Sequence, residues 1–217
     1  MRVESEERKV KRLELKENEK MKDTRNIRIG ILSVIVIAVV LTACGGGNPQ
    51  PKPRGYFRID FPEKQYVRLD TMRYYSFEHP TYSTITPDPH SLHERDWVNV
   101  EFPSYKGTVH VSYKHVDDNL ATYLEDAYTL ITKHISKATG IRDSLVINPK
   151  KKVYGLVYFL EGEGVASPLQ FYLTDSTEHF MRGSLYFNIP PNNDSLQPVI
   201  DFITDDVRHI ISTFEWK

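Results

Sequence analysis

The chain has 217 residues, and its 28 Lys and Arg residues nearly balance its 29 Asp and Glu residues, so its formal net charge is −1. This balance, with no basic block after Cys44 other than Lys150–Lys152, argues against a nucleic-acid partner. The one cysteine, Cys44, leaves no thiol pair, which excludes a disulfide framework and a cysteine-based zinc site.

The first twenty residues carry charges of both signs, including six glutamates. A signal peptide normally opens on a short positive segment, and the chain first has one at Met21–Arg28. Either translation begins at Met21 and residues 1–20 are a gene-start artefact, or they form a cytosolic extension that is lost with the signal peptide. Both explanations place residues 1–20 outside the folded protein.

The apolar segment Ile29–Leu41 has the length of a signal-peptide core and is shorter than the roughly 20 apolar residues that a membrane-spanning helix needs. It ends in Leu41, Thr42, Ala43 and Cys44, which resemble a bacterial lipobox. The small residues suit the signal peptidase, and the thiol of Cys44 is the nucleophile that accepts diacylglycerol. The sequence therefore predicts cleavage before Cys44 and a covalent lipid there, with acyl chains such as palmitate and no cofactor. The alternative is a short membrane anchor that is never cleaved.

Residues 44–53 contain three consecutive glycines and then prolines, which predicts a tether between the lipid and a folded domain. Ten basic and seven acidic residues precede Cys44, which leaves 18 and 22 in the mature chain and a net charge of about −4. Gly45 stands where an inner-membrane retention signal has aspartate, and no acidic surface-export run follows. We expect a membrane-anchored envelope lipoprotein, in the outer membrane and facing the periplasm. Residues 1–43 are its extension and signal peptide, and residues 54–217 are one domain.

Aromatic residues from Tyr56 to Phe61 partly alternate with charged residues before Pro62, which predicts an edge strand. Two interpretations remain open for this strand. It seals the sheet, or its Tyr56, Phe57 and Arg58 form a docking site for a partner protein.

A long loop is predicted over residues 78–96, where three prolines lie among Ser and Thr residues. Its His90, His93 and Glu94 are candidate metal ligands, because imidazole and carboxylate groups bind transition metals. Their spacing is not that of the HExxH motif, and the prolines interrupt any helix. A solvated loop or a partner-binding loop is therefore the preferred interpretation.

Alternation of apolar and polar residues predicts most of the strands. They form a hairpin over residues 98–102 and 107–114 and then four segments at 144–147, 153–160, 169–175 and 180–188. The segment 153–160 is almost continuously apolar, which predicts a central strand.

Two amphipathic helices are predicted from apolar residues at helical spacing. The first begins after Asn119 and stops at Gly140, and the second begins at Asp194 or Ser195 and ends near Phe214. The outer face of the second carries four charged residues: Asp201, Asp205, Asp206 and Arg208. The element order predicts an α+β fold, a largely antiparallel sheet with two packed helices, comparable to the PsbP and Mog1 αβ sandwiches.

Several short stretches follow one another in a distinctive order along the mature chain. They are PRGYFRIDFP after the tether, YSFE, WVNVEFP, LTD with the following FMRGSLYFN, and the ending ISTFEW. Together they resemble the gliding-motility lipoprotein GldD family of Bacteroidetes over nearly the whole mature chain. The resemblance implies a part in gliding motility, tied to type IX secretion, with the membrane and other envelope proteins as partners. It supplies no catalytic residues.

Common catalytic motifs are missing from the sequence, including GxSxG, the Walker loop, GxGxxG and SxxK. The sequence therefore predicts a protein that is not an enzyme, has no small-molecule substrate and acts by binding other proteins of the gliding and secretion apparatus. One alternative is a periplasmic lipoprotein that binds a small ligand or metal through residues 79–96. Another is a hydrolase of envelope polymers, which would have paired carboxylates in a cleft.

Overall fold

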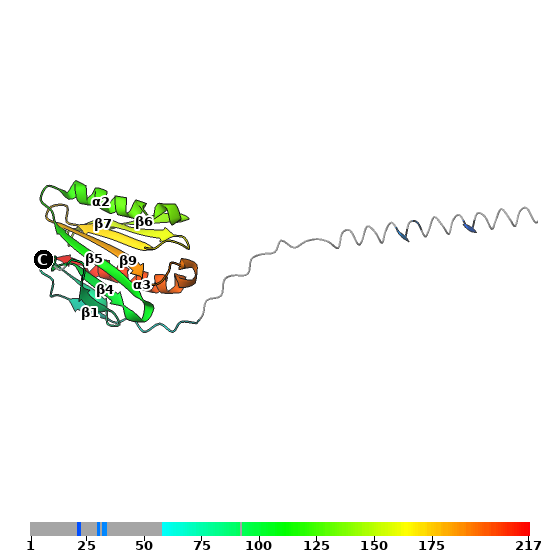
Figure 1. Ribbon diagram of the computed structural model, residues 1–217, viewed down its shortest axis with the longest axis horizontal. Coiled ribbons are helices and arrows are strands. Elements are labelled where there is room, and N and C mark those ends of the chain that lie inside the picture. The colour runs from blue at the N-terminus through cyan, green and yellow to red at the C-terminus, as the bar shows by residue number, and fades with distance from the viewer. Residues whose placement is uncertain (1–20, 23–29, 31, 34–57, 92) are drawn as a thin grey trace, which may run out of the picture. The chain divides into compact units, whose positions relative to one another are not determined.

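The computed structural model describes residues 21–22, 30, 32–33, 58–91 and 93–217 (Figure 1). The described residues from Arg58 onward belong to one compact unit, Tyr56–Lys217. This unit has antiparallel sheets and two packed helices, which confirms the predicted α+β class.

Seven antiparallel strands form the main sheet, in the order β3-β4-β5-β9-β8-β7-β6. Their bounds are β3 Thr84–Pro87, β4 Val98–Phe102, β5 Gly107–His115, β6 Gly140–Asn148, β7 Val153–Glu161, β8 Leu169–Thr174 and β9 His179–Phe187. The predicted hairpin is β4–β5, and β6 to β9 form a meander. Alternation specified these strands because one face of each meets the core while the other meets α2 or solvent.

A smaller sheet joins the first and last strands of the domain. Its central strand β2 (Tyr75–Pro80) pairs with β1 (Tyr66–Leu69) on one side and with β10 (Glu215–Trp216) on the other. Aromatic packing supports this junction, since the Trp216 ring lies 4.6 Å from the ring of Phe214 and 5.1 Å from that of His179, centroid to centroid.

Helix α3 (Asn193–Thr213) packs against one face of the main sheet and contributes much of the core. The buried residues of its apolar stripe include Val199, Ile203, Val207 and Ile210. Burying one aliphatic side chain of this size contributes about 1.5–3 kcal/mol. The helix begins slightly earlier than predicted, so Pro198 lies beyond the first turn.

Helix α2 (Leu120–Thr132) covers the opposite face of the sheet (Figure 1), where Ala127 packs with Phe180, and Ile131 packs with Leu160. It ends at Thr132 and does not continue to Gly140 as predicted, because Gly140 is the first residue of β6. After Ile131 the chain buries little apolar surface, and a helix without such packing is marginal in water.

Two further predictions were wrong. The first strand is β1, since the described part of Tyr56–Phe61 has no regular structure and Phe61 instead stacks on Phe202, with ring centroids 4.3 Å apart. Residues 78–96 are not one loop, because they contain the end of β2 and all of β3. The predicted central strand, β7, is an interior strand that pairs with β6 on one side and β8 on the other.

The predicted signal peptide, lipobox and tether lie outside the described residues, apart from five positions between 21 and 33. Among the residues whose structure is described, no helix has both the length and the hydrophobicity needed to cross a membrane.

Candidate functional site

Strand β6 is an open edge of the main sheet. It pairs with β7 along nine residues and with no other strand in the described part of the chain. Leu145 and Ile147 are 70% and 65% exposed, and Ile141 on the same face is 41% exposed. The other edge, β3, has four residues and ends in Pro87, which is how proteins commonly blunt a sheet edge. A long apolar edge such as β6 is instead a surface to which another chain can add a strand.

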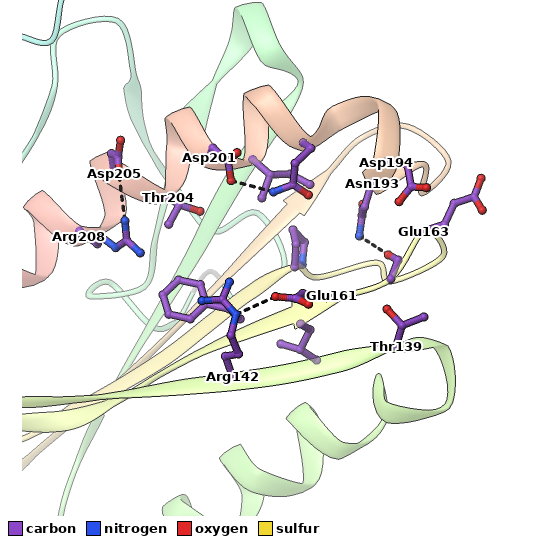
Figure 2. Close-up of a pocket in the computed structure, with 16 residues that line it drawn as sticks. Thr139, Arg142, Glu161, Glu163, Asn193, Asp194, Asp201, Thr204, Asp205 and Arg208 are labelled. Carbon is purple, nitrogen blue, oxygen red and sulfur yellow. Dashed lines mark hydrogen bonds and ion pairs between the residues drawn. The ribbon is translucent and has the colours of Figure 1, made fainter. Parts of the chain in front are cut away.

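A groove runs along the other face of β6, between the strand pair β6–β7 and helix α3 (Figure 2). Its first part has a volume of about 750 Å³. Arg142 of β6 donates a hydrogen bond to Glu161 of β7 at 2.7 Å, and Arg208 of α3 donates to Asp205 at 3.1 Å. Figure 2 shows these two ion pairs on opposite walls of the groove, one on the strands and one on the helix.

The second part of the groove continues along β6 and has a volume of about 890 Å³. It shares Arg142, Phe159 and Arg208 with the first part. The guanidinium carbon of each arginine lies 5.4 Å from the centre of the Phe159 ring, a contact that contributes about 0.5–1 kcal/mol at an exposed site. The apolar lining of this part includes Val146, Val157 and Ile211. The groove therefore joins an apolar half to a charged half at Phe159.

Carboxylates outnumber guanidinium groups in the charged half. Three acids line it besides the two that pair with arginines: Glu163, Asp194 and Asp201. Asp201 accepts a hydrogen bond from Gln197 at 2.8 Å. The excess of negative charge favours an occupant with basic side chains.

Asn193 holds the end of the groove in place. Its buried side chain donates through Nδ2 to the carbonyl oxygens of Gly162 and Val165, at 2.9 and 2.8 Å. The first residue of α3 thus anchors the β7–β8 turn, which carries Glu163, and this contact sets the distance between the two walls.

Another face of α3 carries a polar centre at Asp206, which the helical pattern placed on the outer face but which is fully buried. Lys64 Nζ, Tyr66 OH and Tyr82 OH donate hydrogen bonds to its carboxylate, at 2.7, 3.0 and 2.7 Å. Burial, followed by the hydrogen bond to Asp206, raises the pKa of both tyrosines, so they remain protonated donors. This centre joins the segment before β1 and the β2–β3 turn to α3.

Among the predicted partner-binding residues, only Arg58 is described. It is exposed, and its Nε donates to Asp60 at 3.0 Å, an exposed ion pair that contributes little to stability. Tyr56 and Phe57 lie outside the described residues, as do the lipobox residues and Cys44, so partner binding and lipidation there stay predictions.

The candidate metal ligands do not form a cluster. His90 and His93 are exposed, and Oε1 of Glu94 accepts a hydrogen bond from Lys114 at 2.7 Å. Across residues 58–91 and 93–217 and the few described positions before them, no group of three or more His, Cys, Asp or Glu side chains could hold a metal ion.

The sequence interpretation did not identify the groove. Apolar residues at Leu145 and Ile147 predicted a strand, yet nothing along the chain showed that this strand would lie at an edge. Arg142 and Arg208 come from distant parts of the sequence and meet only through their shared contact with Phe159.

Comparison with known proteins identifies the family. The sequence model of the gliding motility lipoprotein GldD family matches residues 46–216. Among curated proteins, no sequence matches this chain. Among solved structures, the solution structure of cyanobacterial PsbP (CyanoP) from Synechocystis sp. PCC 6803 is similar, with a TM-score of 0.43 and 14% identity over 72% of this chain and 95% of that chain. Because the family match extends over most of the chain and includes every strand and helix of the described domain, the protein belongs to the gliding motility lipoprotein GldD family.

Proposed function

We propose that this protein is a lipid-anchored, non-catalytic component or assembly factor of the gliding and type IX secretion apparatus. Membership of a gliding motility lipoprotein family supports the part in motility. The lipobox ending at Cys44 supports attachment to an envelope membrane, in our proposal the outer membrane with the domain facing the periplasm. Residues 44–53 would then be the tether between the lipid and the domain.

The open edge of β6 is the observation that carries the proposed mode of action. We propose that an extended segment of another envelope protein adds to β6 as a further strand. Backbone hydrogen bonds along the edge would supply affinity, and side chains in the adjoining groove would supply specificity. The exposed Leu145 and Ile147 favour apolar residues at alternate positions of the partner, and the acidic half of the groove favours basic residues beside them.

The lipid anchor is tested in a strain that lacks the gene. We expect the deletion to abolish surface spreading and the wild-type gene to restore it, whereas Cys44→Ala should fail because no thiol can accept the lipid. In a membrane fractionation, the Cys44→Ala protein should carry no lipid and should therefore be absent from the lipidated protein of the membrane fraction. Gly45→Ala keeps the thiol and is the matched control, which should restore spreading. Normal spreading of the deletion strain, or full rescue by Cys44→Ala, would contradict the proposal.

The β6 edge is tested by the double substitution Leu145→Lys and Ile147→Lys. Both side chains are mostly exposed, so the domain should fold and remain on the membrane, while two ammonium groups on the apolar face should prevent strand addition. We expect spreading to fall to the level of the deletion strain and a crosslinked partner to be lost from the detergent-solubilised complex.

Val67→Lys is the matched control for the double variant, because Val67 is 46% exposed on β1, the edge strand of the smaller sheet. It should spread like wild type. If the β6 variant also spreads and keeps its partner, the edge is not the docking surface, although the family assignment and the anchor would stand.

A further inference from the structure

The face of the main sheet beneath α2 holds a guanidinium group without a carboxylate partner. Arg182 of β9 is half-buried, and it forms no ion pair with any of the residues that the structure describes. Its Nη2 donates a hydrogen bond to Oε1 of Gln170 at 2.6 Å. Burial lowers the pKa of Arg182, an effect that the neighbouring Tyr186 phenol partly opposes.

Two hydrogen-bond donors at this place have no acceptor. Nε of Arg182 and Nε2 of Gln170 are both buried and both lack a partner among the described residues. Gln170 is 0% exposed, so its amide cannot turn to solvent. A buried donor that lacks an acceptor costs about 1–3 kcal/mol, and more when the group is charged, so folded proteins rarely keep one without a reason. Since both groups only donate here, what they lack is an acceptor, and an anion is the best one.

The sheet register brings further polar groups to the same place. Ser184, the small residue at the centre, lies opposite Gln170 on β8 and opposite His110 on β5. The ring centroid of Tyr186 lies 5.8 Å from that of His110, and its hydroxyl lies 3.4 Å from Nε2 of His134. Because the side chain of Ser184 is small, the larger side chains of its neighbours lie around it.

Arg182 supplies the positive charge at this place. Partial burial is the largest cause of a lowered pKa at both His110 and His134, and the charge of Arg182 lowers both pKa values further, which favours neutral imidazoles. The acids that oppose this effect at His110 are Asp88 and Glu101, and neither acts appreciably on Arg182. Within the described part of the chain, the cluster therefore has donors and the positive charge of Arg182 but no carboxylate that pairs with the guanidinium.

We propose that Arg182 and Gln170 form the binding site for a small oxyanion, a phosphate or carboxylate group, that enters beside Tyr186. The guanidinium presents adjacent N–H groups in a planar arrangement that matches two oxygens of such an anion, and the Gln170 amide supplies a third donor. Arg182 and Tyr186 are partly exposed and His110 is exposed, so the cluster borders solvent on this side, from which the anion would approach. This site is on the opposite face of the sheet from the groove beside α3 and does not depend on it.

The proposal is tested by thermal unfolding of the protein purified from membranes in neutral detergent, followed by tryptophan fluorescence at constant ionic strength. The probes are inorganic phosphate, acetate, and dioctanoyl phosphatidic acid added to the micelles, with chloride as the reference. We expect phosphate or acetate to raise the midpoint by about 2–4 °C, because a ligand that binds only the folded state stabilises it. A response to phosphatidic acid alone would assign the same site to a lipid headgroup.

Two variants distinguish anion binding at this site from a general stabilising effect of salt. Arg182→Met removes the unpaired charge, and Gln170→Glu supplies a carboxylate beside it. Gln170→Glu should unfold at a higher temperature than wild type without added anion, because its carboxylate pairs with the guanidinium, whereas Arg182→Met leaves Oε1 of the buried Gln170 without its donor and should not. Both variants should lose the response to the probe. Arg142→Met removes an exposed arginine that is paired with Glu161, and it should respond like wild type.

The proposal is overturned if none of the three probes shifts the wild-type midpoint. It is also overturned if Arg182→Met and Gln170→Glu respond as strongly as wild type, because the anion would then bind elsewhere on the protein.

Discussion

Replacement of Asp206 by alanine is expected to lower the free energy of unfolding by about 3 kcal/mol. The carboxylate is fully buried and is the shared acceptor for Lys64, Tyr66 and Tyr82, so its removal leaves three donors without that partner. Lys64 keeps its hydrogen bond to the carbonyl oxygen of Phe202 at 2.8 Å and is partly exposed, which moderates the loss. Urea unfolding of the purified chain in detergent, followed by tryptophan fluorescence, measures the change.

The neighbouring Asp205 is the matched control for this substitution. It lies on the same helix, but its side chain is exposed and, among the described residues, its ion pair is with the exposed Arg208, so Asp205→Ala should cost less than about 0.5 kcal/mol. Asp206→Asn keeps an acceptor oxygen and loses the charge, and it should fall between the two. Equal unfolding midpoints for Asp205→Ala and Asp206→Ala would show that the buried network does not stabilise the domain.

The second large effect is expected at Gly155 of β7. A Cβ atom added there would lie 1.9 Å from the carbonyl oxygen of Tyr172 and 2.9 Å from its carbonyl carbon. Both are backbone atoms of β8, so no side-chain rotation can relieve the contact, and the two strands must separate. We expect Gly155→Ala to cost about 4 kcal/mol or more, enough to reduce folded protein sharply. Its level in membranes and its urea midpoint measure this effect.

Gly164 provides the control, because it lies in the turn between the same two strands. The nearest atom to its added Cβ is Cδ of Lys137 at 3.9 Å, an ordinary contact with a flexible side chain. Gly164→Ala should therefore stay within about 0.5 kcal/mol of wild type. Wild-type stability of Gly155→Ala would mean that β7 and β8 do not approach each other as closely as this structure shows.

Local sequence patterns were sufficient to predict most of the strands and helix α3. The alternation in Val98–Phe102 and the apolar stripe of α3 depend on neighbours a few residues away, and both led to the correct element and the correct buried face. The same reasoning failed where the extent of an element depends on packing against distant parts of the chain. The stripe of α2 continues in sequence to Ile135, but the helix ends at Thr132, after the last buried residue.

The structure corrected the predicted exposure of Asp206, and the physical reason is contact with distant segments. Helical spacing predicts that Asp206 lies on the outer face of α3. It is buried because Lys64, Tyr66 and Tyr82, which come from distant segments, cover it. Whether a residue is covered depends on which remote segment lies over it, and a periodic pattern holds no information about that.

The sequence by itself determined the α+β class, the strand and helix types over most of the domain, and the family resemblance that the family match confirmed. These features follow from the order and spacing of residue types along the chain. Only the tertiary structure decided that β6 is an open edge, that Arg142 and Arg208 meet at Phe159, and that the buried Nε of Arg182 has no acceptor among the described residues. Each of these depends on strand order and on contacts between residues far apart in sequence, which the packing of the folded chain sets.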